Sequence, residues 1–314
     1  MDLSVIIVNW KSLEFAKHCI ASLLATLHEL EYEIIVVDNA SEDCSEISAM
    51  YPEVRLINSE HNVGFAGANN LGFANSSGDK LLFLNPDTLV LPNAVLRMAL
   101  ILDAEPQLGA VGCRLLNPDL TLQMNSTQRF PTIMNQLLSI NFIRRHWPRL
   151  PMWGMQGLFS DKPYEVFDVD VVSGACLMVK RDVFESVGCF SRDYFMYAEE
   201  VDLCWKIVRA GYKVCHASHA RVVHFGGQST KSSSNASMDI AMRKSVFTFL
   251  CKSRGTLYAT LYRMTLVFSA ALRLTLLTLV LAVLNWRGAR SRTIAIRAFK
   301  KWANVAQWAL AIRA

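Results

Sequence analysis

The sequence predicts a doubly wound α/β fold, in which helices flank a mostly parallel sheet, followed by an apolar and basic helical extension at the C-terminus. Two observations predict the sheet. In the first half of the 314-residue chain, short β-rich apolar runs alternate with stretches whose apolar residues have helical spacing. The runs are continuously apolar rather than alternating, as expected for parallel strands buried on both faces. The extension is predicted from a change in composition beyond residue 230.

Each predicted strand is a short run rich in Val, Ile, Leu or Phe. In chain order the predicted strands cover 5–8, 33–37, 55–57, 80–84, 111–116, 169–179 and 222–225. The predicted helices between them cover 13–30, 65–75, 93–104 and 199–210. Ser12 is a candidate N-cap of the first helix, and Pro92 precedes the third. The proline-rich stretch 117–166 has no such pattern and is predicted to be a long, functional loop.

The composition excludes several classes of protein. Hydrophobic residues make up 52% of the chain and charged residues 19%, which excludes intrinsic disorder, and 15 Gly and 9 Pro exclude a collagen-like chain. The net charge of +5 hides an asymmetry, because residues 1–230 hold 18 Lys and Arg against 26 acids, whereas 231–314 hold 14 against one. A basic tail on an acidic body indicates a nucleic acid, an anionic membrane or an acidic partner for the tail.

The eight cysteines lie mostly inside apolar runs and form no CxxC pair. We therefore expect buried free thiols, which suit a reducing cytosol. The N-terminus lacks the basic region of a signal peptide, which gives the same expectation.

Asn or Asp residues follow three of the predicted strands at the point where each strand ends. Asn9 follows the first strand, Asp38 and Asn39 follow the second, and Asn85 and Asp87 follow the fourth. Turn chemistry explains any one of them by itself. Ligands of doubly wound folds bind beyond the carboxyl ends of the strands, so three such ends together predict a polar binding cleft.

Residues 62–72 form a segment of glycines, alanines and asparagines. Glycines let the backbone approach a ligand closely, and a helix that starts near Phe65 would offer free N–H groups to an anion. The segment matches neither the dinucleotide-binding pattern nor the P-loop pattern. Its candidate ligand-binding residues are Asn62, Gly64, Phe65, Asn69 and Asn70.

Three acids begin the predicted helix over 199–210. Glu199 and Asp202 fall on its polar face, where acids in a first turn commonly interact with the helix dipole. Glu200 falls at the edge of the apolar face, and an inward-facing carboxylate beside a cleft is a candidate general base. Further along, His224 ends a strand before two glycines and is a candidate ligand.

The motifs occur in an order that resembles a known family. About residues 3–230 carry, in succession, SVIIVNW, VVDNAS, NVGFAGANNLG, LLFLNPDT, GACLMVKRDVFESVGCF, FMYAEEVDLCWKI and VVHFGG. Together these motifs resemble glycosyltransferase family 2, and within it the bacterial rhamnosyltransferase-like branch. The resemblance implies a GT-A fold, a nucleotide-diphosphate sugar donor, a divalent metal (Mg²⁺ or Mn²⁺) and inversion at the anomeric carbon.

The resemblance also implies roles for individual residues. Asp38 stands where the family binds the nucleotide base. Asn85 and Asp87 stand at the DxD-type metal motif, of which Asp87 is the remaining acid. Glu200 stands at the catalytic base, and His224 at a ligand of the metal or of the diphosphate.

The chain departs from the family pattern at two positions, which leaves an alternative open. Asn85 replaces the first acid of the metal motif, and the acidic pair is Glu199-Glu200 where Glu-Asp is usual. We predict an inverting glycosyltransferase that moves L-rhamnose from dTDP-rhamnose to a hydroxyl of a lipid-linked or polysaccharide acceptor in cell-envelope glycan synthesis. The alternative is a catalytically silent nucleotide-sugar-binding protein of a glycan assembly complex.

The C-terminal tail is predicted to attach the chain to an anionic membrane. Residues 231–255 are predicted to form a linker and a helix, and 256–314 a helical tail whose apolar stretch 264–286 holds one charge, Arg273. An arginine near the centre disfavours a full span, so we expect peripheral or monotopic attachment to the cytoplasmic face of the inner membrane. Arg263 and Arg273 would then face the headgroups. A soluble helical hairpin is the alternative, and no nucleic-acid partner is expected.

Overall fold

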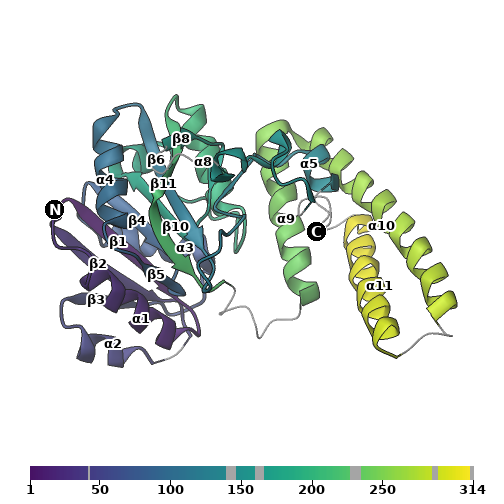
Figure 1. Cartoon of the computed structure of the whole chain (residues 1–314), viewed down its shortest axis with the longest axis horizontal. Helices are drawn as coiled ribbons and strands as arrows, with labels where there is room; N and C mark the ends of the chain where they lie inside the picture. Colours follow the sequence, from purple (N-terminus) through teal and green to yellow (C-terminus); the bar gives the residue numbers. More distant parts are fainter. Residues whose placement is uncertain (42, 139–145, 160–165, 227–234, 285–288, 312–314) are drawn as a thin grey trace. The chain divides into compact units, whose positions relative to one another are not determined.

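The computed structural model describes residues 1–41, 43–138, 146–159, 166–226, 235–284 and 289–311. Within these residues the chain forms two compact units, both drawn in Figure 1. The first unit holds the described residues of 1–130 and 146–232 and is an α/β domain. The second holds those of 131–145 and 233–314 and is helical. The predicted division at residues 230 and 255 stays a prediction.

The first unit is built on a sheet whose strand order is β3-β2-β1-β4-β10-β6-β11-β5, with β8 paired to β11 (Figure 1). Its strands are β1 (Leu3–Asn9), β2 (Tyr32–Asp38), β3 (Val54–Asn58), β4 (Lys80–Leu84), β5 (Thr88–Val90), β6 (Leu108–Leu116), β8 (Val166–Asp168), β10 (Cys176–Lys180) and β11 (Lys213–His224). Two further short strands, β7 (Thr127–Gln128) and β9 (Val171–Val172), pair with each other.

The sheet is mostly parallel, as predicted. β1 pairs in parallel with β2 and β4, β2 with β3, and β6 with β11. β10 is inserted antiparallel between β4 and β6, and β5 and β8 are antiparallel to β11. The carboxyl ends of β1, β2, β3, β4, β6 and β11 therefore meet at one edge. At the same edge lie the residues that precede β5 and β10.

Helices cover both faces of the sheet. The helices of the first unit are α1 (Leu13–Leu24), α2 (Ser45–Met50), α3 (Gly64–Ala74), α4 (Ala94–Ala104), α7 (Arg181–Ser186) and α8 (Glu199–Arg209), with 3₁₀ turns η1 (Pro151–Trp153) and η2 (Gln156–Phe159). Buried side chains of α1, α2 and α4 join those of the strands in the main core. On the other face, α3 packs on β1 and β2 through Ala68, against Val8, Ile35 and Val37.

Several predicted elements differ from the structure. The predicted strand 169–179 is wrong, because residues 173–175 turn between β9 and β10. The predicted strand 222–225 is too short, since β11 starts at Lys213. The polar residues His216 and Ser218 interrupt the apolar pattern of β11 in the sequence, although both side chains are buried.

The first helix is also shorter than predicted and starts differently. It ends at Leu24 rather than at residue 30. Ser12 occupies the N-cap position but makes no side-chain cap. Its hydroxyl instead donates to Asn9 Oδ1 at 3.0 Å, so the residue supports the strand end of β1.

All eight cysteines are free thiols, as predicted, and six of them are buried. The two that are half-buried are Cys189 and Cys251.

The second unit contains α5 (Ile133–Leu138), α9 (Asn235–Arg254), α10 (Thr256–Leu284) and α11 (Ala289–Leu310). α10 and α11 are antiparallel, because the guanidinium of Arg263 stacks on Trp308 at 5.3 Å and that of Arg273 on Trp302 at 4.2 Å. Both arginines of α10 therefore face α11. The indole rings give both half-buried guanidinium groups partners within the helical unit, and their orientation toward headgroups stays a prediction.

The outer face of α10 is apolar and exposed. Its exposed large apolar side chains follow one helical stripe and are Leu257, Leu261, Met264, Phe268, Leu272, Leu276, Leu279 and Val280. Phe268 keeps 74% of its surface accessible. Among the described helices, the part of α10 from Thr256 to Leu281 is long and apolar enough to cross a membrane, by length and composition alone.

Candidate active site

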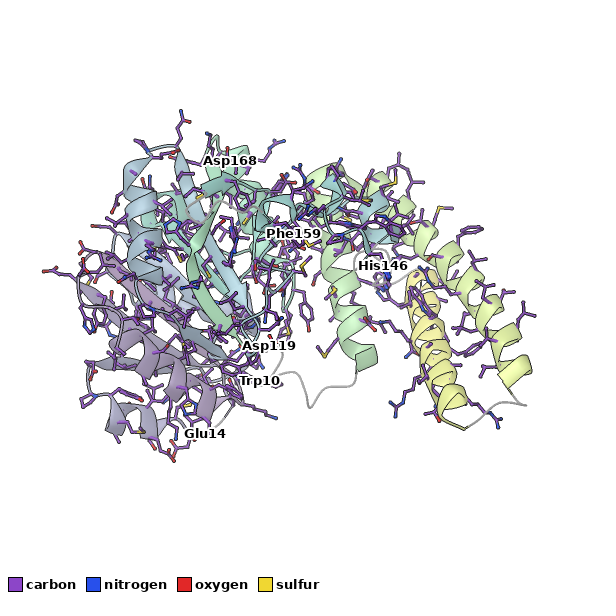
Figure 2. The ribbon with its side chains drawn as sticks, viewed as in Figure 1. Trp10, Glu14, Asp119, His146, Phe159 and Asp168 are labelled. Atoms are coloured by element: carbon purple, nitrogen blue, oxygen red, sulfur yellow. The ribbon has the colours of Figure 1, made fainter. Side chains whose placement is uncertain are left out.

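The predicted site residues gather at the edge of the sheet where the parallel strands end. Figure 2 marks this edge with Trp10 and Asp119, which follow β1 and β6. The chain runs outward from β1 through β2 and β3 on one side and returns to β4 on the other. Such a reversal of strand order opens a crevice in which doubly wound folds bind ligands.

Asp38 lies at the centre of a hydrogen-bonded cluster at the ends of β1 and β2. Its Oδ1 accepts bonds from Asn9 Nδ2 at 3.0 Å and from the Ser41 hydroxyl, and its Oδ2 accepts one from the Ser41 N–H at 3.0 Å. The Cys44 thiol also donates to Oδ1. Asn9 is fully buried and Asp38 nearly so. The cluster fixes the Asp38 carboxylate, whose Oδ2 retains room for another donor.

Asn39 ties the end of β2 to the loop before α3. Its Nδ2 donates to Asn62 Oδ1 at 3.0 Å, and its Oδ1 accepts from the Val63 N–H at 2.9 Å. Asn62 Oδ1 also accepts from the Gly64 N–H at 3.0 Å. Asn39, Asn62 and Gly64 therefore form one structured wall beside Asp38.

Asn69 and Asn70 do not project together into that wall. Asn69 Nδ2 donates back to the Phe65 carbonyl at 3.0 Å, within α3. Asn70 binds the backbone of Phe190 twice, through Nδ2 to the carbonyl at 2.8 Å and through Oδ1 from the N–H at 3.1 Å. Both amides thus have protein partners, and a direct role for them in sugar-nucleotide binding stays a prediction.

Asp87 and His224 meet at the ends of neighbouring segments. Asp87 precedes β5 and His224 ends β11, and the register pairs His224 with Thr88. His224 Nε2 lies 3.3 Å from Asp87 Oδ1, and both residues are buried. On its other side, His224 Nδ1 lies 3.0 Å from Gln123 Oε1, which accepts its proton, while Gln123 Nε2 donates to the His224 carbonyl. The ring is thereby oriented with Nε2 toward the carboxylate.

This arrangement fits a divalent cation. A histidine that ligates a metal usually donates its other ring N–H to an oxygen, as His224 does to Gln123. Among the described residues no group of three or more His, Cys, Asp and Glu side chains forms a complete metal site. The pair would supply only part of a coordination shell, which suits Mg²⁺ or Mn²⁺ because these ions take their remaining oxygens from phosphates and water.

The acidic residues of α8 have different surroundings. Gly174 lies against the side chain of Glu200, since a Cβ built there would lie 3.4 Å from Glu200 Cβ. The neighbouring Ala175 carbonyl accepts from the Asn85 N–H at 3.0 Å, so the turn 173–175 touches both Glu200 and the loop of Asp87. Glu200 therefore lies at the same edge as Asp87, as the predicted role requires.

Burial perturbs the two glutamates. Burial raises the pKa of Glu200, and burial together with the charge of Glu200 raises the pKa of Glu199 well above its usual range. Glu199 Oε2 is buried with no hydrogen-bond partner among the described residues. Asp202 differs, because Tyr194 donates to it at 3.1 Å and Lys206 lies 3.6 Å from it. Asp202 is thus a structural acid.

Sequence reasoning missed some residues of the site. Gln123 lies in the stretch 117–166, which has no periodic pattern and gave no sign that one residue would orient His224. Ser41 and Cys44 complete the Asp38 cluster. The polar residues directly after Asp38 in the sequence could have indicated Ser41, whereas no sequence pattern indicated Cys44.

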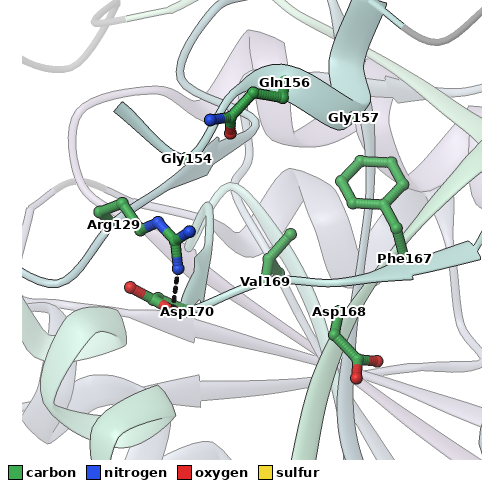
Figure 3. Close-up of a pocket in the computed structure, with 8 residues that line it drawn as sticks. All are labelled: Arg129, Gly154, Gln156, Gly157, Phe167, Asp168, Val169 and Asp170. Carbon is green, nitrogen blue, oxygen red and sulfur yellow. Dashed lines mark hydrogen bonds and ion pairs between the residues drawn. The ribbon is translucent and has the colours of Figure 1, made fainter. Parts of the chain in front are cut away.

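A cavity of about 380 Å³ lies elsewhere in the first unit (Figure 3). It is lined by Arg129, Gly154, Gln156, Gly157, Phe167, Asp168, Val169 and Asp170, and it contains an ion pair of 3.0 Å between Arg129 and Asp170. Asp168 lies at the opposite end of the unit from Trp10 (Figure 2). This cavity therefore does not belong to the predicted cleft.

Comparison with solved structures identifies the fold class as GT-A. The mannosyltransferase PcManGT from Pyrobaculum calidifontis, solved in complex with GDP-Man and Mn²⁺, aligns over 98% of this chain and 84% of its own, with a TM-score of 0.58. The sequence identity is 16%, so this likeness concerns the fold alone. The predicted fold class is confirmed.

The chain belongs to glycosyl transferase family 2, whose model matches residues 4–188. It is similar to the N-acetylglucosaminyl-diphospho-decaprenol L-rhamnosyltransferase of Mycobacterium tuberculosis strain H37Rv, with 30% identity over 86% of this chain and 91% of the relative. It is also similar to the rhamnosyltransferase WbbL of Escherichia coli K12, with 24% identity over 80% and 93% of the two chains. The resemblance to the rhamnosyltransferase-like branch is therefore confirmed.

Proposed function

We propose that this family 2 glycosyltransferase inverts the anomeric carbon as it moves L-rhamnose from dTDP-rhamnose to a hydroxyl of a lipid-linked or polysaccharide acceptor, in cell-envelope glycan synthesis. One observation carries the proposal. A partly buried carboxyl with a raised pKa, Glu200, and the Asp87–His224 pair lie on either side of the turn 173–175. Inverting transfer needs these two functions, a base for the acceptor proton and charge stabilisation for the leaving diphosphate.

Glu200 is proposed to take the proton of the acceptor hydroxyl. Its raised pKa brings the carboxyl closer to the pH at which a general base works well. Glu199 lies next to it in the chain, and the charge of Glu200 adds to burial in raising the pKa of Glu199, so Glu200 is the carboxyl of the pair that ionises first. General-base catalysis of this kind contributes typically about 10²–10⁴-fold.

Asp38 is proposed to receive the nucleotide base. Four donors from Asn9, Ser41 and Cys44 fix its carboxylate, and Oδ2 accepts only the Ser41 N–H among them. A thymine or uracil N3–H would supply the further donor. Asn39, Asn62 and Gly64 would line the same side of the cleft, with Asn85 between Asp38 and Asp87.

Asp87 and His224 are proposed to hold a divalent metal, Mg²⁺ or Mn²⁺. When bound, the metal would act as a Lewis acid on the leaving diphosphate. Asp87 contributes the negative charge for this site, and His224 the imidazole nitrogen that Gln123 orients.

A donor screen tests the proposal. The full-length protein is incubated with Mg²⁺ or Mn²⁺ and with dTDP-rhamnose, UDP-sugars or GDP-sugars, and release of the nucleoside diphosphate and sugar transfer to a polyprenyl-diphosphate glycan are measured. We expect turnover with dTDP-rhamnose. Binding of a sugar nucleotide with no turnover on any acceptor would instead support the silent binding protein, for which the Glu199-Glu200 pair is the one structural argument.

We further propose that the second unit attaches the enzyme to the cytoplasmic face of an anionic membrane, as a monotopic protein. Support comes from the uncharged outer stripe of α10, defined above, and from the basic side chains of α11. Arg292, Arg297 and Lys300 are exposed, and no acid occurs in α10 or α11. Arg273 is held against Trp302, on the side of α10 that faces α11. If α10 lies in the membrane surface on its outer stripe, Arg273 stays near water, whereas a membrane-spanning α10 would have to bury this charge in the hydrocarbon.

Vesicle sedimentation tests the attachment. Full-length protein should pellet with phosphatidylglycerol-containing vesicles and be partly released by high salt, because each basic residue near the surface contributes about 1 kcal/mol. Phe268→Asp should weaken binding. Leu100→Asp changes a similarly exposed residue of the first unit and serves as the control. Full-length protein that remains in solution at low salt would contradict the attachment.

A further inference from the structure

The segment Cys189–Ala198 connects α7 to α8 and is bound from two sides. It leads directly into Glu199 and Glu200, at the start of α8. On one side it contacts α3, which follows the proposed donor loop, and on the other side it contacts the body of α8. A segment with two such attachments can set the distance between the elements that hold it.

The contacts with α3 are made through the backbone of the segment. Asn70 binds both the N–H and the carbonyl of Phe190, and the Phe65 N–H donates to the Phe195 carbonyl at 3.0 Å. Gly64 is needed for this approach. Its φ is +74°, and a Cβ there would lie 2.3 Å from the Phe195 oxygen. No other residue type fits this position without moving the segment.

The contacts with α8 use the side chains of two residues one turn apart. Asp202 accepts a hydrogen bond from the Tyr194 hydroxyl at 3.1 Å, and Lys206 Nζ donates to the Cys189 carbonyl. Tyr194 is 1% exposed and Asp202 is 1% exposed, so this attachment is buried.

The last two residues before α8 have a left-handed backbone. Tyr197 has φ +71° and Ala198 has φ +64°, and neither is a glycine. Such conformations cost energy and persist only where the surrounding contacts enforce them. Here the contacts of the segment with α3 and α8 enforce the conformation immediately before the two glutamates.

We propose that segment 189–198 is a positioning element that fixes Glu200 relative to the donor loop, through the contact of Gly64 and Phe65 with the Phe195 carbonyl. A continuous path of hydrogen bonds joins Asn39, Asn62 and Gly64 to this contact. The inference rests on the proposed function for the role of Glu200. It adds that the donor loop and the start of α8 are coupled through this segment. A substitution at Gly64 should therefore displace the N-terminal end of α8, where Glu200 lies.

The test compares Gly64→Ala and Tyr194→Phe with Gly211→Ala in the full-length protein. Gly211 also has a positive φ, +90°, but a Cβ there meets nothing within 4 Å, so its substitution introduces backbone strain without a collision. Hydrogen–deuterium exchange is measured in peptides that cover 62–66 and 199–205. The latter include the Asp202 N–H, which donates to the Ala198 carbonyl at 2.9 Å.

We expect exchange in 199–205 to accelerate by about tenfold or more in Gly64→Ala and Tyr194→Phe, and to stay at the wild-type rate in Gly211→Ala. Acceleration confined to 62–66 in Gly64→Ala, or equal acceleration in Gly211→Ala, would overturn the proposal. If Gly64→Ala does not fold, Tyr194→Phe tests the proposal by itself, because it removes only the hydroxyl that bonds Asp202 and keeps the aromatic ring. This readout needs no substrate, so it is independent of whether the proposed function fails.

Kinetics then test the link to catalysis. Tyr194→Phe should lower kcat by about tenfold while the KM for the donor changes less than about threefold, because the base moves and the binding wall does not. If Tyr194→Phe only destabilised the fold, it would lower the fraction of active enzyme and leave the pH dependence of kcat unchanged. Equal changes of kcat in Tyr194→Phe and Gly211→Ala would contradict the positioning role.

Discussion

The two carboxylate sites at the edge of the sheet are held in opposite ways. Asp38 is fixed by donors from Asn9, Ser41 and Cys44, whereas Glu199 and Glu200 are desolvated at the start of α8 and have raised pKa values. A carboxylate surrounded by donors suits recognition, and a carboxyl whose charged form is penalised suits proton transfer. The local environment of each carboxyl is thus enough to give the two sites at one edge of a sheet different functions, binding at one and proton transfer at the other.

The greatest loss of activity is expected at Asp87, which lies beside His224 at the same edge of the sheet. Asp87→Ala should lower turnover by roughly a thousandfold, since the proposed metal would lose its negatively charged ligand and several kcal/mol of stabilisation. The fold should persist, as judged by circular dichroism and melting temperature. Asp119→Ala removes an acid at the same edge whose carboxylate accepts hydrogen bonds from Thr121 in its own turn, and should have little effect. Wild-type turnover of Asp87→Ala, or full activity of the native enzyme in chelator, would contradict the metal role.

The second prediction concerns the base. Glu200→Gln should lower the transfer rate by about 10² or more while the donor Kd, measured by calorimetry, stays close to that of the wild type. Glu199→Gln and Asp202→Asn should cost less. An inactive Glu199→Gln variant together with an active Glu200→Gln variant would contradict the assignment of Glu200 as the base.

The third prediction concerns the recognition carboxylate. Asp38→Asn should raise the donor KM by about 10–100-fold with a smaller change in kcat, because a hydrogen bond to a charged group is worth about 1.5–3 kcal/mol. Ser41→Ala removes one donor to Asp38 without removing the carboxylate and should have a weaker effect in the same direction. A loss in kcat with unchanged KM would show that Asp38 takes part in chemistry.

The smallest predicted effect is on stability. The folded-state pKa of Glu199 is raised, so its contribution to stability is complete below the unfolded pKa and is lost as pH rises through the folded pKa. Glu199→Gln should therefore stabilise the protein by on the order of 1 kcal/mol at pH 7.5 and by nothing near pH 4. Asp202→Asn should do the opposite at pH 7.5, because it weakens the contacts with Tyr194 and Lys206. Thermal melting at both pH values checks the signs.

The sequence predicted those parts of the site that depend on local pattern. Continuous apolar runs gave the central strands, and the polar residues after them gave Asn9, Asp38 and Asp87, because strand ends are local features. Helical spacing was a poorer guide to the acids of α8, because Glu199 and Asp202, predicted on its polar face, are buried, whereas Glu200 is half-buried.

The remaining parts depend on contacts between distant residues. Gln123 orients His224 across 101 positions, and Asn70 reaches Phe190 across 120. The antiparallel insertion of β10 between β4 and β6 leaves no trace in its apolar run, since strand direction is set by the connections. The motif that contains Asn70 therefore predicted a ligand-binding residue, whereas in the structure its side-chain amide is hydrogen-bonded to the backbone of Phe190.

The pH dependence of single-turnover transfer tests directly whether Glu200 is the proton acceptor. At saturating donor and acceptor, the wild-type rate should rise with pH through one ionisation whose midpoint lies above 4.5, the ordinary value for a glutamate. The residual rate of Glu200→Gln should lack this ionisation. If the same rise with pH persists in Glu200→Gln, the titrating base lies elsewhere and the assignment is contradicted.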